Sequence, residues 1–256
     1  ADTNAYNAYA KKNMVSAIAD STGIIDITNN GKGNVYGLYA NSLSLSSAYN
    51  AFVENSGTAT GTINIKNTGD GNTYGMFGKK AYNQTDENVS SVIEIVNAGN
   101  GLAVGMYGSS YAENSGDIII HNLADGTAVG IMVEDNGEVT NSGTITIDRE
   151  SYTDTKGTDD TTDDETYIAG TSKGGLAIGI YGGQNSTITN SADGKIVIND
   201  ALNAYGILAQ TGSIVINKGQ IIIDGNSSHA NAIKLNQGKL FQDGVLTVLC
   251  GNGYDL

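Results

Sequence analysis

The sequence predicts an all-β chain that winds as a parallel β-helix of about seven to eight coils with loop insertions. Three observations support this prediction. One phrase, built from Ile-x-Ile, Asn, a Gly-containing turn and an apolar-Gly-apolar-aromatic segment, returns along the chain. The spacing inside the phrase is constant. Asn and Gly stand between the apolar segments, where they permit the sharp turns that a coiling chain needs.

The phrase itself defines two strands of each coil. It reads IDITNNGKGNVYGLYA from Ile25, INIKNTGDGNTYGMFG from Ile63, IEIVNAGNGLAVGMYG from Ile93 and IIIHNLADGTAVGIMV from Ile118. Self-similarity over a few tens of residues is typical of stacked repeats, which bury their apolar faces against their neighbours. Alternating β-branched residues indicate a strand with one buried face. We therefore expect each strand to pair with its counterpart one coil away.

The spacing of the phrase indicates a coil of fixed size with inserted loops. The second Ile of each Ile-x-Ile recurs at steps of 38, 30, 25, 27, 51 and 25 residues, and falls at Ile27, Ile65, Ile95, Ile120, Ile147, Ile198 and Ile223. From this Ile to the next central Gly is 10 residues in each of the first four coils and 32 in the fifth. The fifth coil therefore contains an insertion, which we assign to the acidic segment 149–173 within a single domain over residues 1–256.

The coil geometry predicts which side chains face the interior. The Ile-x-Ile pairs should form two buried columns, and the residues on both sides of each central Gly, such as Tyr36 and Leu38, should also face inward. We expect the asparagines two positions after the Ile to form a hydrogen-bonded ladder in one corner; these are Asn29, Asn67, Asn97 and Asn122.

The residue two positions after each central Gly should face outward, and it is often aromatic. Successive coils lie about 4.8 Å apart, so these side chains would form a ladder on one side of the β-helix. An aromatic ladder offers a contact surface for a sugar ring or a protein. The alternative is that the bend at the Gly, or a loop, buries the column. The candidate binding residues are Tyr39, Phe77, Tyr107 and Tyr181.

Composition excludes several classes of function. The net charge is −14, and Arg149 is the only arginine, which argues against a nucleic-acid partner because phosphate binding requires Lys and Arg. The single cysteine, Cys250, allows no internal disulfide. The acidic segment 149–173 offers oxygen atoms to Ca²⁺, but its spacing matches no calcium loop, and a solvated surface loop is the favoured interpretation. We expect no cofactor and no metal.

Catalytic arrangements are weakly supported. A Ser-His-Asp triad would have to combine Ser115, His121 and Asp117, around which no nucleophile motif occurs. Asp26 and Glu94 face outward two coils apart, roughly 10 Å, within the range of a paired acid and base in a glycoside hydrolase. The same column becomes apolar after Glu94. We therefore expect no catalytic residues.

Several of these phrases resemble the passenger domains of Gram-negative autotransporters, of the pertactin-like and adhesin type. They are NSGTITI from Asn141, NSGDIII from Asn114, and GNVYGLYA, GNTYGMFG and GLAIGIYG. The resemblance covers about Gly23 to Val248. It implies a right-handed β-helix, exported through the periplasm and outer membrane to the bacterial surface. The C-terminal membrane barrel of that family has no counterpart here, so we expect a fragment of a longer passenger, with membrane attachment only through such a barrel.

The resulting functional expectation is a non-catalytic adhesin or stalk at the bacterial cell surface. Its partners would be a protein or glycan on a host or neighbouring bacterial cell, with self-association as a further possibility. Two alternatives are a polysaccharide-acting β-helix enzyme and the passive stalk of a protease autotransporter. A repeat scaffold by itself does not choose between them, because function on such scaffolds resides in grafted sites.

Overall fold

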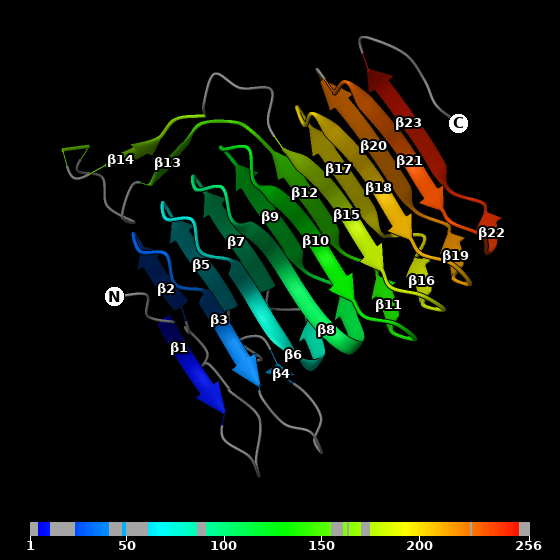
Figure 1. Ribbon diagram of the computed structural model, residues 1–256, viewed down its shortest axis with the longest axis horizontal. Coiled ribbons are helices and arrows are strands. Elements are labelled where there is room, and N and C mark those ends of the chain that lie inside the picture. Colours follow the sequence, from blue (N-terminus) through cyan, green and yellow to red (C-terminus); the bar gives the residue numbers. More distant parts are fainter. Residues whose placement is uncertain are drawn as a thin grey trace.

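A computed structural model of the chain describes residues 5–10, 24–40, 48–49, 61–85, 91–154, 161–162, 164–169, 175–225 and 227–250. These residues form β-strands joined by turns, and the strands stack as the rungs of a parallel β-helix (Figure 1). The fold class predicted from the repeats is confirmed. Within the described residues no helix occurs that could cross a membrane.

The Ile-x-Ile segments form one side of the β-helix, which we call the isoleucine sheet. Its eight strands pair in parallel, each with its counterpart in the next coil, and they run in the order β2 (Ile24–Asn29), β5 (Gly61–Asn67), β7 (Ser91–Asn97), β9 (Asp117–Asn122), β12 (Thr144–Asp148), β17 (Lys195–Asn199), β20 (Gln220–Gly225) and β23 (Val245–Cys250).

The segments around the central glycines form a second side, which we call the glycine face. Its strands are β1 (Ala5–Ala10), β3 (Val35–Ala40), the first parts of β6 (Thr73–Asn83) and β8 (Leu102–Asn114), and then β10 (Thr127–Val133), β15 (Leu176–Gly182), β18 (Asn203–Ala209) and β21 (His229–Leu235). This is the side that faces the viewer in Figure 1.

Short strands form the third side and complete each coil. They are β4 (Ala48–Tyr49), the second parts of β6 and β8, β11 (Glu138–Asn141), β16 (Thr187–Asn190), β19 (Ile214–Asn217) and β22 (Lys239–Gln242). The solenoid has about six turns, slightly fewer than the seven to eight expected.

The two isoleucine columns fill the interior as predicted. From Ile63 to Ile223 the paired isoleucines of six successive strands are buried, and the Leu, Met and Ile side chains that follow the central glycines complete one continuous core. β-branched side chains suit this arrangement because each is flanked above and below by an identical residue on a pleated surface. Each buried Ile contributes roughly 1.5–3 kcal/mol before the cost of ordering the chain.

The prediction that both neighbours of each central Gly face inward is wrong. Leu38, Met76 and Met106 after the Gly belong to the core, but the residues before it lie on the outer surface, as in the Tyr36–Tyr74 stack. The strand bends at the Gly, so that the Gly and the residue after it both face inward. A Cβ on Gly105 would meet Cγ2 of Ile118 at 2.4 Å, which shows why the position holds no side chain.

The predicted asparagine ladder is present, and a second one accompanies it. Side-chain amides join Asn29, Asn67, Asn97 and Asn122 at 2.9, 3.4 and 3.0 Å. The first ladder ends where the guanidinium of Arg149 takes over the corner, donating to the carbonyl oxygens of Asn122 and Ala124. The second ladder uses the last residue of each strand on the third side, and its side-chain amides are joined at 2.7–3.0 Å through Asn83, Asn114, Asn141, Asn190, Asn217 and Gln242. Buried amides paired in this way avoid the cost of unsatisfied polar groups.

Gly105→Ala should destabilise the β-helix by about 1–3 kcal/mol, because the added methyl would lie 2.4 Å from Cγ2 of Ile118 and 2.6 Å from the carbonyl oxygen of Gly130. Ala232 occupies the equivalent position of β21, beyond which none of the described strands pairs to supply a carbonyl. Ala232→Gly is therefore the control, with a change below about 1 kcal/mol. Urea unfolding followed by circular dichroism measures both, and equal effects would contradict this account.

Candidate functional site

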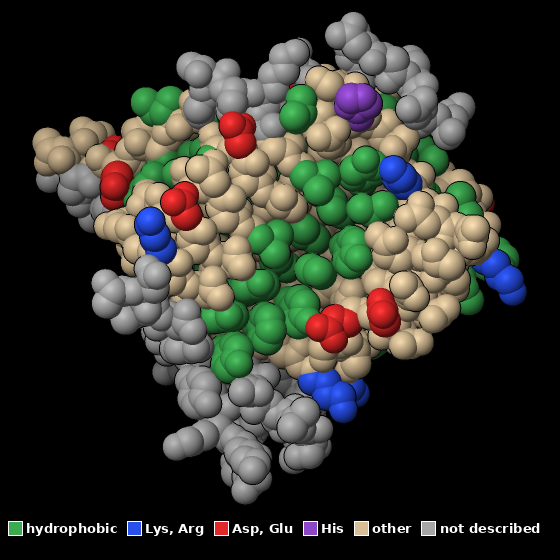
Figure 2. Space-filling view, viewed as in Figure 1, with side chains coloured by type: hydrophobic (Ala, Val, Ile, Leu, Met, Phe, Trp, Pro, Cys, Tyr) green, Lys and Arg blue, Asp and Glu red, His purple; other side chains and the backbone are tan. Residues whose placement is uncertain are grey.

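The outer surface of the glycine face carries a continuous apolar stripe. Because of the bend at each Gly, two outward columns lie side by side, one before the Gly and one after it. Figure 2 shows the resulting band of apolar side chains running across the molecule. Its members are the buried Val104, Val129 and Ile178, and the partly buried Tyr74, Leu102, Tyr107, Met132, Leu176, Tyr181, Tyr205 and Leu208.

The predicted aromatic column lies on this stripe. Tyr39, Phe77, Tyr107 and Tyr181 are each partly buried and face outward on β3, β6, β8 and β15. The rings of Tyr39 and Phe77 are stacked with centroids 5.4 Å apart, and those of Phe77 and Tyr107 with centroids 4.4 Å apart. The structure therefore brings the first three together as one stack. Tyr181 lies two strands further along, beyond Met132 on β10.

The stripe is acidic at the edge where β10 and β15 end. A hollow of ≈ 300 Å³ lies there, lined by Met132, Glu134, Asp135, Tyr181 and neighbouring backbone. The Tyr107 hydroxyl donates a hydrogen bond to Glu134. Burial and the adjacent Glu134 carboxylate raise the pKa of Tyr107, so its hydroxyl remains a donor across the physiological range. This edge combines apolar side chains with fixed carboxylates.

A second group of side chains lies on the outer surface of the isoleucine sheet. Strand register places Lys66, Val96, His121 and Asp148 in one row across β5, β7, β9 and β12. Asp26 and Glu94 belong to the neighbouring row. Parallel pairing brings successive members of a row to about 4.8 Å. Charges distant in the sequence thus become neighbours.

The insertion in the fifth coil covers this group. Its ends form an antiparallel hairpin of β13 (Tyr152–Asp154) and β14 (Glu165–Tyr167), at the upper left of Figure 1. Tyr152 and the buried Tyr167 pack against Val96 and Leu123. The expectation of a purely solvated loop is therefore wrong for these residues. Of the acidic residues on which the calcium alternative depended, Asp159, Asp160 and Asp163 lie outside the described residues.

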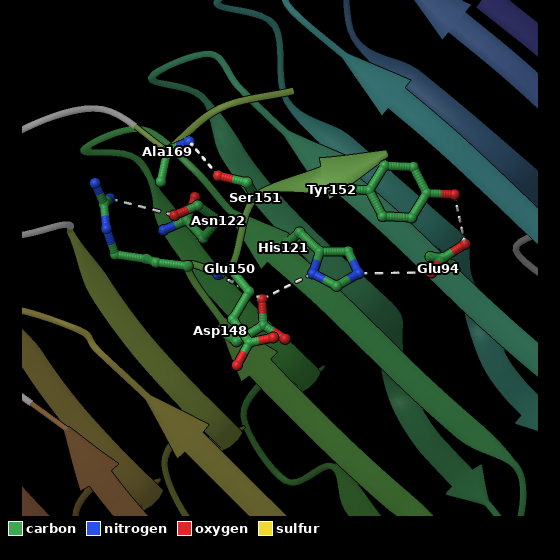
Figure 3. Close-up of polar contacts among 9 residues, drawn as sticks. Glu94, His121, Asn122, Asp148, Glu150, Ser151, Tyr152 and Ala169 are labelled. Carbon is green, nitrogen blue, oxygen red and sulfur yellow. Dashed lines mark hydrogen bonds and ion pairs between the residues drawn. The ribbon is translucent and has the colours of Figure 1, made fainter. Parts of the chain in front are cut away.

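Two clusters of charges form beneath the hairpin. Lys66 is buried, and its Nζ contacts Oδ2 of Asp154 on β13 and lies 3.6 Å from Oδ1 of Asp26. His121 lies between two carboxylates, with Nδ1 2.7 Å from Asp148 and Nε2 3.5 Å from Glu94. The Tyr152 hydroxyl donates to the other oxygen of Glu94 at 3.2 Å. Figure 3 shows this second cluster, with the imidazole held between the two acids.

His121 carries a proton at neutral pH. Burial lowers its pKa, but the hydrogen bonds and charges of Asp148 and Glu94 outweigh this effect and raise the pKa from 6.5 to about 9. The imidazolium donates to both carboxylates, so neither nitrogen is available to accept a proton from a nucleophile. The arrangement stabilises the docked hairpin electrostatically. We call the group of Glu94, His121, Asp148 and Tyr152 the clamp.

The residues of the catalytic combinations considered from the sequence make other contacts in the structure. Ser115 bonds to Thr85 and to the carbonyl oxygen of Asn83, while His121 contacts Glu94 and Asp148 instead of Asp117. Asp26 and Glu94, the possible acid and base, are bonded to Lys66 and to His121 with Tyr152 respectively.

The row of Lys66, His121 and Asp148 was missed by the sequence analysis. The signal in the sequence is the residue directly after the second Ile of each phrase. This residue is charged or ionisable in three of the coils that precede the insertion. Because the alternation of a strand points this residue outward, the row was predictable in principle. The hairpin partners Tyr152 and Asp154 carry no periodic signal.

Comparison with known families agrees with this architecture. Residues 127–242, from β10 to β22, match the family described as the BigA third pectate lyase-like domain. The match covers slightly less than half of the chain. No curated protein and no solved structure shows significant similarity. The match and the fold together fit a β-helix domain of the passenger-like kind.

The clamp predicts a stability that falls as pH rises. Since the folded pKa of His121 is about 9 and the unfolded value is 6.5, its stabilisation is complete below about pH 6.5 and is lost as pH rises through 9. The loss should be of the order of 1–3 kcal/mol. His121→Gln should remove this dependence, whereas His229→Gln, at the exposed start of β21, should retain it. Urea unfolding from pH 6 to pH 9.5 measures the difference, and parallel curves for both variants would contradict the assignment.

Proposed function

We propose that this chain is a non-catalytic β-helical module of a bacterial cell-surface protein, and that it binds a protein partner through the apolar stripe of the glycine face. The match to a BigA domain and the resemblance to autotransporter passengers support a location at the cell surface or outside the cell. The observation that carries the binding role is the stripe itself. It extends over six strands from β3 to β18 on a chain whose interior is already filled.

The stripe has the properties of a contact surface. Aromatic residues and Met are enriched in protein interfaces, and contiguous apolar areas on a soluble surface commonly mark interaction sites. The chain is acidic and of low mean hydropathy, so this apolar band contrasts with the rest of its surface. The rigid parallel strands beneath it hold the side chains in place before binding, which reduces the entropy lost on association.

Ring geometry favours a protein over a glycan. A sugar binds an aromatic side chain by lying on the face of the ring, but in the stack of Tyr39, Phe77 and Tyr107 those faces are directed at one another. The interplanar angles are 17° and 7°. The edges of the rings remain for contact, and edges pack well against aliphatic and aromatic side chains of a partner.

The charges beside the stripe favour a basic partner. Glu134 and Asp135 border the hollow next to Met132 and Tyr181, and the chain as a whole carries a charge of −14. A partner surface in which apolar residues are flanked by Lys or Arg would match this arrangement and would be attracted from a distance. A second copy of the chain would bring like charges together, which argues against self-association through this edge.

The contacts of Arg149 and Lys66 argue against a role for these two residues in a polysaccharide lyase. A lyase needs a free Lys or Arg as base and as a partner for uronate carboxylates. Arg149 donates to the backbone carbonyls of Asn122 and Ala124, and Lys66 is held beneath the hairpin by Asp154. The name of the matched family refers to a pectate lyase-like domain. For this chain we infer only the scaffold from that likeness.

Removing two aromatic side chains of the stripe should strongly weaken binding. Phe77→Ala with Tyr181→Ala should weaken attachment of the labelled chain to host or neighbouring bacterial cells by at least tenfold, because interface aromatics dominate binding energy. Tyr82→Ala, on the third side of the β-helix, is the control and should bind normally. Flow cytometry measures attachment. Treating the cells with protease should remove binding, and glycosidase should not. Absence of binding by the unmodified chain would instead support the passive stalk.

Removing the acidic edge should weaken binding to a lesser degree. Glu134→Gln with Asp135→Asn should lower the affinity several-fold at low ionic strength and change it little at high salt, since screening removes long-range attraction. Asp193→Asn with Asp243→Asn removes the same number of charges from exposed turns and serves as the control. Equal loss in both double variants would show that net charge, and not this edge, determines the attraction.

A further inference from the structure

We propose that Lys66 and Asp154 form an intramolecular amide bond that fixes the hairpin of the insertion to the isoleucine sheet, with Asp26 as the group that carries the proton. This inference is independent of the proposed binding function. It concerns a site on the opposite side of the β-helix from the apolar stripe, and it assigns a covalent role to residues that the clamp around His121 does not use.

Geometry supplies the first argument. Nζ of Lys66 contacts Oδ2 of Asp154, and both side chains are nearly excluded from water, with exposed fractions of 5% and 9%. Lys66 is fixed by its place in β5, and Asp154 by the pairing of β13 with β14. Holding two reacting groups in contact converts a bimolecular condensation into a unimolecular one and removes a large part of its activation barrier.

A third group completes the site. Oδ1 of Asp26 lies 3.6 Å from the same Nζ, and its side chain is 56% exposed, so it borders both the buried pair and the solvent. This position suits a group that takes a proton from the amine and returns it to the leaving oxygen. Asp26 is held there by the register of β2 with β5, one row away from Lys66.

Burial of the pair favours loss of the two charges, because the side chains of Lys66 and Asp154 are both nearly excluded from water. A buried ion pair is costly to maintain because each ion has lost its water. An amide in the same place carries no charge and needs only its N–H and C=O to be bonded.

The reaction balances without a further reactant. A proton first passes from the Lys66 ammonium to the Asp154 carboxylate. The neutral amine attacks Cγ of Asp154, and a C–N bond forms. Asp26 removes a proton from this nitrogen and delivers it to the hydroxyl on Cγ, and the C–O bond breaks with release of water. Asp26 returns to its starting state, and no atom is oxidised or reduced.

The bond would do what a disulfide does in other exported proteins. The chain has one cysteine and forms no internal disulfide. Lys66 and Asp154 are separated by 88 residues, so the bond would close a loop that includes β5 to β13. Cross-links of this kind reduce the freedom of the unfolded chain and keep the hairpin docked when its other contacts break.

Mass spectrometry of the intact, denatured chain tests the proposal. The expected mass is that of the sequence minus one water molecule, and proteolysis should yield one branched peptide that joins the segments around Lys66 and Asp154. The full sequence mass, with only linear peptides from these two segments after prolonged incubation of the folded protein, would overturn the proposal and leave a non-covalent ion pair.

Variants separate the covalent bond from the ion pair. Lys66→Arg keeps the positive charge and should restore the full sequence mass, whereas Lys79→Arg, at an exposed position, should retain the deficit. Asp154→Asn should change the lost group from water to ammonia. Asp26→Asn should slow formation at least tenfold while circular dichroism remains unchanged. An unchanged mass deficit in Lys66→Arg would refute the assignment of Lys66, and an unchanged rate in Asp26→Asn would refute the role of Asp26.

Discussion

The structure depends on the close approach of each central glycine to the methyl group of an isoleucine. Each central Gly leaves a space that Cγ2 of an isoleucine from the following coil occupies, as Gly105 does for Ile118 and Gly130 for Ile145. The glycine face and the isoleucine sheet therefore approach closely, and each coil fixes the position of the next. Hydrogen-bonded amides repeat this constraint at two corners. The interior is narrow and filled by apolar side chains, so it tolerates few other residues.

The bend at the Gly also creates the candidate binding surface. A strand with regular alternation would turn the residue before the Gly inward, but the Gly and its successor both face the core. Two outward columns result instead of one. Val104 and Val129 lie on the outer surface of the β-helix, where larger neighbouring side chains cover them. The same backbone feature thus serves core packing and surface chemistry. The acidic edge near Glu134 adds direction to an otherwise uniform stripe.

Periodicity in the sequence predicted the two sheets and their main inward and outward columns, but not the second asparagine ladder or the features that occur once. The isoleucine columns, the first asparagine ladder and the outward column with Tyr39 and Phe77 follow from periodicity, because stacking places identical residues above one another. The inward assignment of Tyr36 failed because alternation was assumed to continue through the Gly. The docking of Tyr152 and Asp154 on the sheet was not predictable, since it depends on tertiary contacts of an insertion without internal repetition. The charged row from Lys66 to Asp148 could have been predicted, because the position after the second Ile faces outward in every coil and parallel register aligns it across four strands.

The interlock of Gly and Ile has a consequence for how such a chain changes length. A coil contacts chiefly the coils directly before and after it, and those neighbours present nearly the same surface at every level. Duplication or deletion of the coding sequence for one whole turn would preserve the contacts between adjacent coils. Insertion or deletion of a single residue within a strand would shift its register and expose the isoleucines. Evolution of this architecture should therefore proceed in units of about one turn, lengthening or shortening the apolar stripe without redesigning it.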